Sequence, residues 1–251
     1  MSMLFHQLFE PVSSTYTYLV GCTETRQAVL IDPVLRSWQR DTDELKRLGL
    51  TLAYTLDTHI HADHITGALR LKEQTGSLIG HPAVDRLPCT DLPVEENQTI
   101  CVGGLTIEPL FTPGHTDGHH AYRVNDRVLT GDALLIDACG RTDFQNGDAR
   151  ILYQSIHQKL FSLGDDTLVY PGHDYEGRRV SSIGQEKARN PRLGNDTPLE
   201  AFVEIMDGMN LPYPKFIDFA LPGNQQCGVC PPGVPDSLQQ YCHEIGESPQ
   251  G

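Results

Sequence analysis

Thr58-His59-Ile60-His61-Ala62-Asp63-His64 holds the densest set of metal-binding side chains in this sequence. It follows residues 52–56, a short apolar run that is typical of a buried strand. Imidazole and carboxylate groups are ligands that suit Zn²⁺ or Fe²⁺. The stretch therefore predicts a metal site in a loop after a buried strand, with His59, His61, Asp63 and His64 as candidate ligands.

Three more potential ligands follow predicted strands further along the chain, each next to Gly or Pro. They are His115 in Thr112-Pro113-Gly114-His115, Asp132 in Thr130-Gly131-Asp132, and His173 in Pro171-Gly172-His173-Asp174. Because loops at one end of a sheet converge, four separate loops are expected to place all seven residues around one pocket. No cysteine joins this set, which argues against a structural zinc site of the cysteine type.

The hydrophobic pattern of residues 1–175 predicts a core domain of short strands with interleaved helices. Residues 16–20 and 27–31 are β-rich runs that are expected to form a hairpin. Helices are predicted to end at Gly49 and Gly76, and a third is predicted to begin at Asp148. Further strands are expected at residues 99–102, 105–111, 121–124, 127–129 and 168–170.

The composition changes after Gly177, and residues 176–251 are expected to pack on the core domain as helices and a tail rich in Pro and Gly. Residues 180–187 have a helical pattern. Thr197-Pro198-Leu199-Glu200 has the form of a capping box with Pro at the first helical position. From Leu211 onward Pro and Gly are dense, so an irregular tail is predicted.

Composition limits the classes of partner. Of the 251 residues, 39% are hydrophobic and 21% charged, as in a globular protein. The net charge of −14 repels phosphate backbones, so no nucleic-acid partner is expected, and an anionic substrate would need a local group of Arg or Lys. No apolar run reaches the length of a membrane span, and residues 1–6 lack the features of a leader, so a cytoplasmic protein without a membrane partner is expected.

The seven cysteines are odd in number and scattered in position. In a reducing cytosol most of them are expected to be buried thiols. Cys227-Gly228-Val229-Cys230 has the form of a redox pair or half a zinc site, but no second pair or nearby His completes a site.

With these motifs in order between Tyr16 and His173, the sequence resembles the metallo-β-lactamase superfamily. The resemblance implies an α/β fold, an αββα sandwich with the metal site at one edge of its two sheets. In dinuclear members the first metal would be held by His59, His61 and His115, and the second by Asp63, His64 and His173. Asp132 would bridge the two.

Within the superfamily the sequence looks like the persulfide dioxygenase family, the group that contains the ethylmalonic encephalopathy protein. The closer match lies in residues 131–136, in Cys139-Gly140-Arg141-Thr142-Asp143-Phe144-Gln145, in residues 171–175 and in residues 190–192. It implies one Fe(II) per chain, held by His59, His115 and Asp132. The remaining four residues of the ligand set would orient those ligands from behind: His61, Asp63, His64 and His173.

The same resemblance implies a mononuclear non-haem iron dioxygenase that oxidises glutathione persulfide with O₂ to sulfite and glutathione. The two carboxylates of glutathione would need placed cations, and Arg141 and Arg192 match the family's glutathione-side positions. Tyr175 could donate a hydrogen bond to the substrate. The family often forms homodimers, so a homodimer is possible here.

Other functions are consistent with parts of the pattern. Glyoxalase II, a dinuclear hydrolase of S-acylglutathione thioesters, also has the His-x-His-x-Asp-His run, and all seven ligand-capable residues are present here. The Cys139-to-Gln145 stretch and the Pro-rich tail favour the dioxygenase. A non-catalytic binding protein is disfavoured because no ligand is lost, and a nuclease is disfavoured by the net charge.

Overall fold

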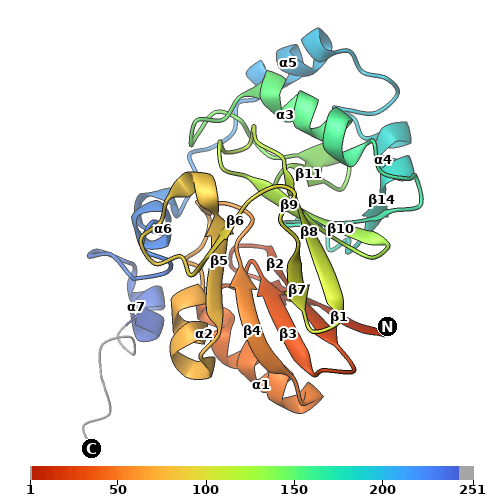
Figure 1. The fold of residues 1–251 in the computed structure, drawn as a ribbon. Helices are drawn as coiled ribbons and strands as arrows, with labels where there is room; N and C mark the ends of the chain where they lie inside the picture. The colour runs from red at the N-terminus through yellow and green to blue at the C-terminus, as the bar shows by residue number, and fades with distance from the viewer. Residues whose placement is uncertain (1, 243–251) are drawn as a thin grey trace, which may run out of the picture.

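Two six-stranded sheets lie face to face in residues 2–242, the part of the chain that the computed structural model describes (Figure 1). The first sheet has the strand order β1-β2-β3-β4-β5-β6, with antiparallel pairing from β1 to β3 and parallel pairing from β3 to β6. Its strands are β1 (Met3–Glu10), β2 (Thr15–Cys22), β3 (Gln27–Ile31), β4 (Thr51–Leu56), β5 (Leu78–Pro82) and β6 (Leu92–Val94).

The second sheet has the order β14-β13-β10-β9-β8-β7 and is antiparallel except for the β10–β13 pair. Its strands are β7 (Ile100–Val102), β8 (Leu105–Phe111), β9 (His120–Val124), β10 (Arg127–Gly131), β13 (Leu168–Pro171) and β14 (Ser181–Ser182). A short hairpin of β11 (Leu134–Leu135) and β12 (Ala138–Cys139) follows β10.

Side-chain alternation along the strands builds the core between the sheets. In β2, Tyr16, Tyr18 and Val20 face the second sheet, where they pack in one cluster with residues such as Ile107. Leu19 points the other way and packs against the helices that cover the first sheet. Successive side chains of a strand face opposite sides, so one strand contributes to two layers of core.

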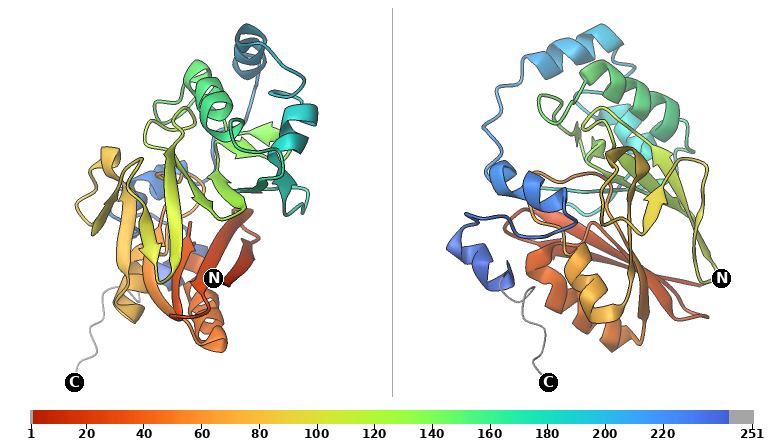
Figure 2. Two further views of the ribbon diagram at one scale, coloured as in Figure 1. Left: turned by 45° about the vertical axis from the view of Figure 1, so that its right-hand side comes forward. Right: turned by 60° about the vertical axis from the view of Figure 1, so that its left-hand side comes forward.

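Helices cover both outer faces, as Figures 1 and 2 show. The first sheet is covered by η1 (Leu35–Ser37), α1 (Trp38–Leu48) and α2 (Ala68–Thr75), and η2 (Ala83–Asp85) follows β5. The second is covered by α3 (Ala149–Ser155), the π-helical turn η3 (Ile156–Leu160), α4 (Ile183–Arg189) and α5 (Leu199–Asp207). The order helix, sheet, sheet, helix confirms the predicted αββα sandwich.

Local signals placed several helix ends correctly. Gly49 and Gly76 end α1 and α2 in the left-handed conformation, with φ of 63° and 74°, which glycine adopts without steric cost. Asp148 begins α3, where its carboxylate accepts a hydrogen bond from the Ile151 N–H at 3.0 Å. The predicted third helix therefore starts at the expected residue.

The prediction of a capping box at Thr197 is wrong. The Thr197 hydroxyl donates to the Gly194 carbonyl at 2.6 Å instead of accepting from the helix, and Pro198 is itself the residue that precedes α5. The Glu200 side chain, the other half of the expected box, pairs with Arg150 on α3. A contact with a neighbouring helix thus replaces the local one.

The irregular tail predicted after Leu211 is also wrong. α6 (Ile217–Asn224) and α7 (Asp236–Cys242) lie there, and α6 contains Pro222. Pro222 lies late in α6, where the pattern suggested a helix breaker, while Ile217 and Ala220 are buried and hold the helix in place. Residues 243–251 of the predicted C-terminal region lie outside the described part of the chain.

The prediction that most cysteines are thiols is wrong as well. Disulfides join Cys89 to Cys227 and Cys230 to Cys242. The remaining three are free, namely Cys22, Cys101 and Cys139. The partners are 138 residues apart in the first pair, and only the folded chain brings them together, so spacing could not reveal the pairing. None of the helices in residues 2–242 has the length and apolar character needed to cross a bilayer.

A thiol titration tests these pairings. Under denaturing, non-reducing conditions the chain should show three reactive thiols, and after reduction it should show seven. Peptide mapping should link Cys89 to Cys227 and leave Cys227 unlinked to Cys230. Seven thiols before reduction would contradict both disulfides.

Candidate metal centre

The predicted ligands converge at one edge of the sandwich. The histidine loop, residues 58–66, follows β4 of the first sheet, whereas the other ligands follow β8, β10 and β13 of the second. The two sheets are joined beside these loops, where the Tyr16 N–H donates to the Gly172 carbonyl at 2.8 Å. Five of the seven ligand-type residues line one cavity of about 690 Å³: His59, Asp63, His115, Asp132 and His173.

The histidine loop is held from below by Asp32, which is 1% exposed and lies just after β3. Its carboxylate accepts from the Thr58 N–H at 2.7 Å, from the Thr58 hydroxyl at 3.0 Å and from His61 Nε2 at 3.1 Å. Asp32 itself has a φ of 51°, a left-handed conformation that Asp adopts more readily than most residues. A buried carboxylate with three donors is fully satisfied and fixes the start of the loop.

Hydrogen bonds fix the tautomers of His59 and His115. The Thr58 hydroxyl donates to Asp32, so it accepts from His59 Nδ1 at 2.8 Å and leaves Nε2 of His59 with a free lone pair. The Arg141 carbonyl accepts from His115 Nδ1 at 2.7 Å and so directs Nε2 of that ring towards the cavity. Burial, followed by the neighbouring His61 and His115, holds the pKa of His59 well below its usual value. Its ring is therefore neutral, as a metal ligand must be.

Asp132 is placed by its backbone. The Asp132 N–H donates to Nε2 of His119 at 3.1 Å, and Nδ1 of that ring bonds the Thr112 hydroxyl at 2.9 Å. Both ring nitrogens of His119 are thus engaged, so His119 supports Asp132 and is not free to bind a metal ion. A Cβ on Gly140 would collide with the Asp132 carbonyl and crowd the His115 ring, so glycine permits this close approach.

The geometry fits a metal ion. One ligand atom each from His59, His115 and Asp132 lie within 4.8 Å of one another, and Oδ1 of Asp132 is buried without a hydrogen-bond partner. A buried, unpartnered carboxylate oxygen is costly unless a ligand satisfies it. Nε2 of His115 lies 3.5 Å from Oδ2 of Asp132, so both atoms face the same space.

A second group, His61, Asp63 and His64, meets the same distance criterion. Its carboxylate is engaged, since Asp63 Oδ2 accepts from His64 Nδ1 at 2.8 Å and from the Thr15 hydroxyl at 3.0 Å, while Nδ1 of His61 and Nε2 of His64 are buried without a hydrogen-bond partner in residues 2–242. Burial alone would lower the pKa of His61, but Asp32, with Asp63 and Asp57, raises it to about 9. His64 already engages the Asp63 carboxylate, whereas Oδ1 of Asp132 has no hydrogen-bond partner in the described chain, so the first group has the freer carboxylate.

Four cations line the cavity, and they differ in the partners they already have. Arg141 pairs with both oxygens of Asp143 at 2.6 and 2.7 Å, and Arg178 pairs with Asp174 at 2.7 Å. Arg192 donates to the Cys139 carbonyl at 2.7 Å. Within residues 2–242, neither Arg192 nor Lys215 forms an ion pair with a carboxylate.

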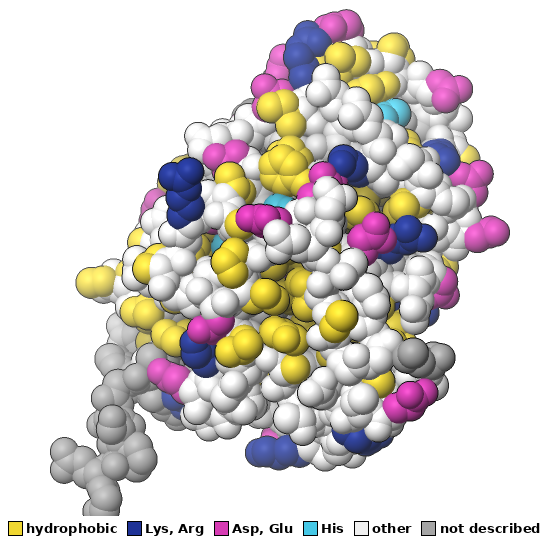
Figure 3. Space-filling model, in the orientation of Figure 1, with side chains coloured by type: hydrophobic (Ala, Val, Ile, Leu, Met, Phe, Trp, Pro, Cys, Tyr) yellow, Lys and Arg dark blue, Asp and Glu magenta, His cyan; other side chains and the backbone are white. Residues whose placement is uncertain are grey.

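Aromatic rings form much of the remaining wall. Tyr175 stacks on His173 with 6.0 Å between ring centres and is 76% exposed, so its ring covers the ligand cluster from the solvent side. Phe144, Tyr213 and Phe216 also line the cavity. On the face shown in Figure 3, histidine atoms are visible only in small areas among other side chains, in keeping with the burial of most histidines.

Sequence reasoning missed three residues that matter to this site. Asp32 is not among the predicted site residues, although an Asp-Pro pair after a strand could suggest a fixed carboxylate. Lys215 lies in the tail that was expected to be irregular. Asn224 bonds the histidine loop across 163 and 160 positions, and no local signal marks it.

Comparison with known proteins places these features in context. The sequence model of the metallo-beta-lactamase superfamily matches residues 11–173. The human protein named persulfide dioxygenase ETHE1, mitochondrial, is 48% identical over 234 residues, which cover 92% of this chain and 91% of the human one.

Solved structures agree. The structure of ETHE1 from Myxococcus xanthus has a TM-score of 0.87 and 51% identity, and the match covers 90% of this chain and 99% of that one. A metallo-beta-lactamase from Staphylococcus aureus has a TM-score of 0.83 at 24% identity, covering 94% of this chain and 76% of that one, and shows the fold alone.

Metal analysis of two variants tests which group of ligands holds the ion. Asp132→Ala should lose nearly all bound metal, because it removes the one carboxylate of the first group. His64→Ala should keep about one metal ion per chain, because His64 belongs to the second group. Equal loss of metal from both variants would show that the second group is also a binding site.

Proposed function

Because this chain belongs to the metallo-beta-lactamase superfamily and, within it, to the persulfide dioxygenase family, we propose that it oxidises glutathione persulfide at a single Fe(II). The chain is a sulfur dioxygenase that uses a persulfide and O₂. The observation that carries the finer proposal is the group of His59, His115 and Asp132 at the floor of the cavity. Two imidazoles and one carboxylate form the facial set typical of non-haem Fe(II) oxygenases.

Bound Fe(II) would supply a redox-active centre with positions open to O₂ and to a sulfur anion. The protein's part is to hold the ligands ready. The Thr58 hydroxyl and the Arg141 carbonyl accept from Nδ1 of His59 and of His115, so that both Nε2 atoms face the cavity. His119 fixes the backbone of Asp132. Such surrounding partners orient ligands and tune their basicity.

We propose that His61, Asp63, His64 and His173 support this set without holding a second ion. His61 directs Nε2 to Asp32 at 3.1 Å, so this nitrogen is engaged in holding the histidine loop. His173 donates from Nδ1 to the Ser14 carbonyl at 3.1 Å, and its Nε2 lies 3.6 Å from Oδ1 of Asp132. From there it can stabilise the negative charge that gathers at the site.

The walls suit an anionic peptide thiol derivative. Glutathione persulfide carries two carboxylates and a persulfide anion. We propose that Arg192 and Lys215 receive the carboxylates, because neither is neutralised by a carboxylate of the described chain. Arg141 is already balanced by Asp143 and would contribute orientation rather than net charge. Tyr175 covers the site beside His173, and its hydroxyl can donate a hydrogen bond to the substrate.

The overall reaction balances without an external reductant. One persulfide, one O₂ and one water give glutathione, sulfite and protons, and the terminal sulfur provides all four electrons. Hydrolysis of S-acylglutathione by a glyoxalase II-like dinuclear centre remains the alternative, because the second ligand group is intact.

An oxygen-electrode experiment separates the two functions. The enzyme loaded with Fe(II) should consume one O₂ per glutathione persulfide and should leave S-lactoylglutathione intact. Metal analysis of the same sample should find one iron per chain. Two zinc ions per chain together with rapid thioester hydrolysis would refute the proposal.

Substitution of the two available cations tests how the substrate is held. Lys215→Ala and Arg192→Ala should each raise KM for glutathione persulfide by about tenfold, with kcat changed less than about twofold, because a charged hydrogen bond to a carboxylate is lost. Lys46→Ala on α1, which removes an exposed cation far from the cavity, is the control. A fall in kcat with unchanged KM would contradict a binding role.

A further inference from the structure

Asn224 reaches the histidine loop from the far end of the sequence. It is the last residue of α6, its side chain is 2% exposed, and three of its hydrogen bonds go to the loop. The amide nitrogen donates to the His61 carbonyl and to the His64 carbonyl, both at 2.8 Å. The amide oxygen accepts from the Thr66 N–H at 2.8 Å. One side chain thus satisfies three buried backbone groups.

These bonds have no substitute in the backbone. Among residues 2–242, no backbone N–H donates to the carbonyls of His61 or His64. The loop between β4 and α2 is irregular, so its polar groups depend on side chains for partners. Loss of the Asn224 amide would leave them unpaired in a buried region, and the loop would have to move to satisfy them.

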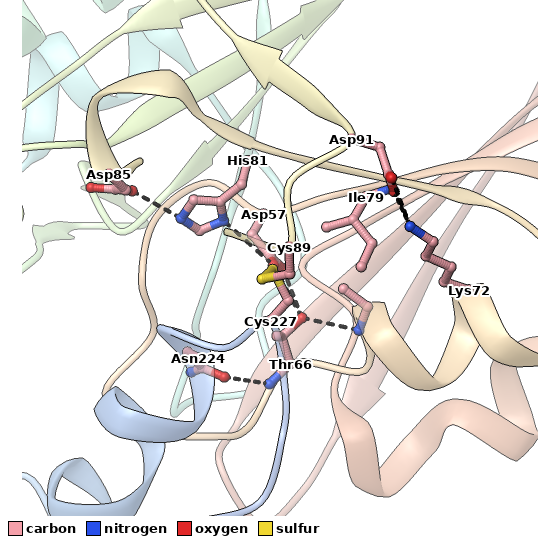
Figure 4. Close-up of a disulfide and its surroundings, with 11 residues drawn as sticks. Asp57, Thr66, Lys72, Ile79, His81, Asp85, Cys89, Asp91, Asn224 and Cys227 are labelled. Carbon is pink, nitrogen blue, oxygen red and sulfur yellow. Dashed lines mark hydrogen bonds and ion pairs between the residues drawn. A yellow bond between two sulfur atoms is a disulfide. The ribbon is translucent and has the colours of Figure 1, made fainter. Parts of the chain in front are cut away.

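A disulfide anchors Asn224 in turn. Cys227 lies three residues after Asn224, is 2% exposed and is bonded to Cys89 in the segment between η2 and β6 (Figure 4). The turn after α6 lies against the histidine loop. The Leu69 N–H donates to the Cys227 carbonyl at 3.2 Å, and a Cβ on Gly228 would collide with the Thr66 carbonyl.

The same region is tied to the floor of the site through Thr66. The Thr66 hydroxyl donates to the Asp57 carboxylate at 3.0 Å, and Asp57 lies 3.7 Å from Nδ1 of His81 and 3.9 Å from Nε2 of His61. Figure 4 shows Asn224, Thr66, Asp57 and the disulfide gathered in one place. Movement of the turn after α6 would therefore shift the backbone of the histidine loop.

We propose that Asn224 is a positioning residue that fixes the histidine loop around the metal, and that the Cys89–Cys227 disulfide holds Asn224 in place. The inference rests on the metal site of the proposed function but not on the reaction carried out there. Asn224 lies behind the loop and touches neither the substrate cavity nor the three proposed ligands.

Cobalt(II) is the probe for this proposal, because its visible spectrum reports the ligand geometry without any need for turnover. Asn224→Ala should change the spectrum of the Co²⁺-loaded protein and speed Co²⁺ release to a chelator by about tenfold, the lower end of the effect of losing a direct partner of a ligand, because Asn224 acts on the ligands through the loop backbone. Leu45→Ala, a core truncation on α1, should lower the melting temperature but leave the spectrum and release rate unchanged.

A purely structural role for Asn224 would give the pattern of Leu45→Ala, and that result would overturn the proposal. A wild-type protein that binds no Co²⁺ would instead refute the metal site itself. A wild-type protein that binds Co²⁺ normally but fails to oxidise a persulfide when loaded with Fe(II) would refute the proposed reaction alone.

The disulfide is tested by matched double variants, which also serve if Asn224→Ala does not fold. Cys89→Ser with Cys227→Ser should release Co²⁺ several times faster than wild type, in the same direction as Asn224→Ala. Cys230→Ser with Cys242→Ser removes the other disulfide, which packs near Ile65 but makes no bond to the turn that follows Asn224, and should release Co²⁺ more slowly than the first double variant. Equal release from both double variants would contradict a specific role for Cys89–Cys227.

Discussion

The bonds of the buried Asp32 carboxylate are the constraint on which the site depends. Asp32 ends the run of β3 in a left-handed conformation and holds Thr58 and His61 of the neighbouring β4 loop. The Thr58 hydroxyl in turn bonds Nδ1 of His59 and fixes the tautomer of that ring. Because β3 and β4 are parallel neighbours, the Asp32 carboxylate after β3 lies next to the loop after β4 and fixes the orientation of its imidazole rings. The fold brings the ligand loops together, and Asp32 holds the histidine loop in the conformation in which His59 faces the cavity.

Much of the fold could be predicted because its signals are local. The hairpin at residues 16–31 and the glycines that end α1 and α2 depend on alternation and on backbone conformation, which the sequence states directly. The errors arose where distant contacts decide. The Thr197 hydroxyl bonds the Gly194 carbonyl instead of capping α5. α6 forms despite Pro222, because other elements bury its apolar face. Strand β1 was not predicted, although it pairs along its whole length with β2.

The candidate site was predictable in its residue types but not in its supports. His59, His115 and Asp132 follow strands and could be grouped by that rule, and the structure brings them together. Asn224 and Lys215 arrive from the last quarter of the chain, where only folding shows what they touch. Metal identity, the expected homodimer and the expected cytoplasmic location stay predictions, because they depend on ions, partners and surroundings beyond the chain itself.

The cysteine pairing also sets a condition on how the chain matures. Cys227 and Cys230 are three positions apart, whereas each native partner is more distant, at 138 and 12 positions. Close neighbours in an unfolded chain meet far more often than distant ones. Oxidation before folding would therefore favour local mispairing, which thiol exchange must then undo. Correct pairing is favoured when the sandwich forms first and delivers Cys227 to Cys89, so the order of folding and oxidation governs the yield of native protein.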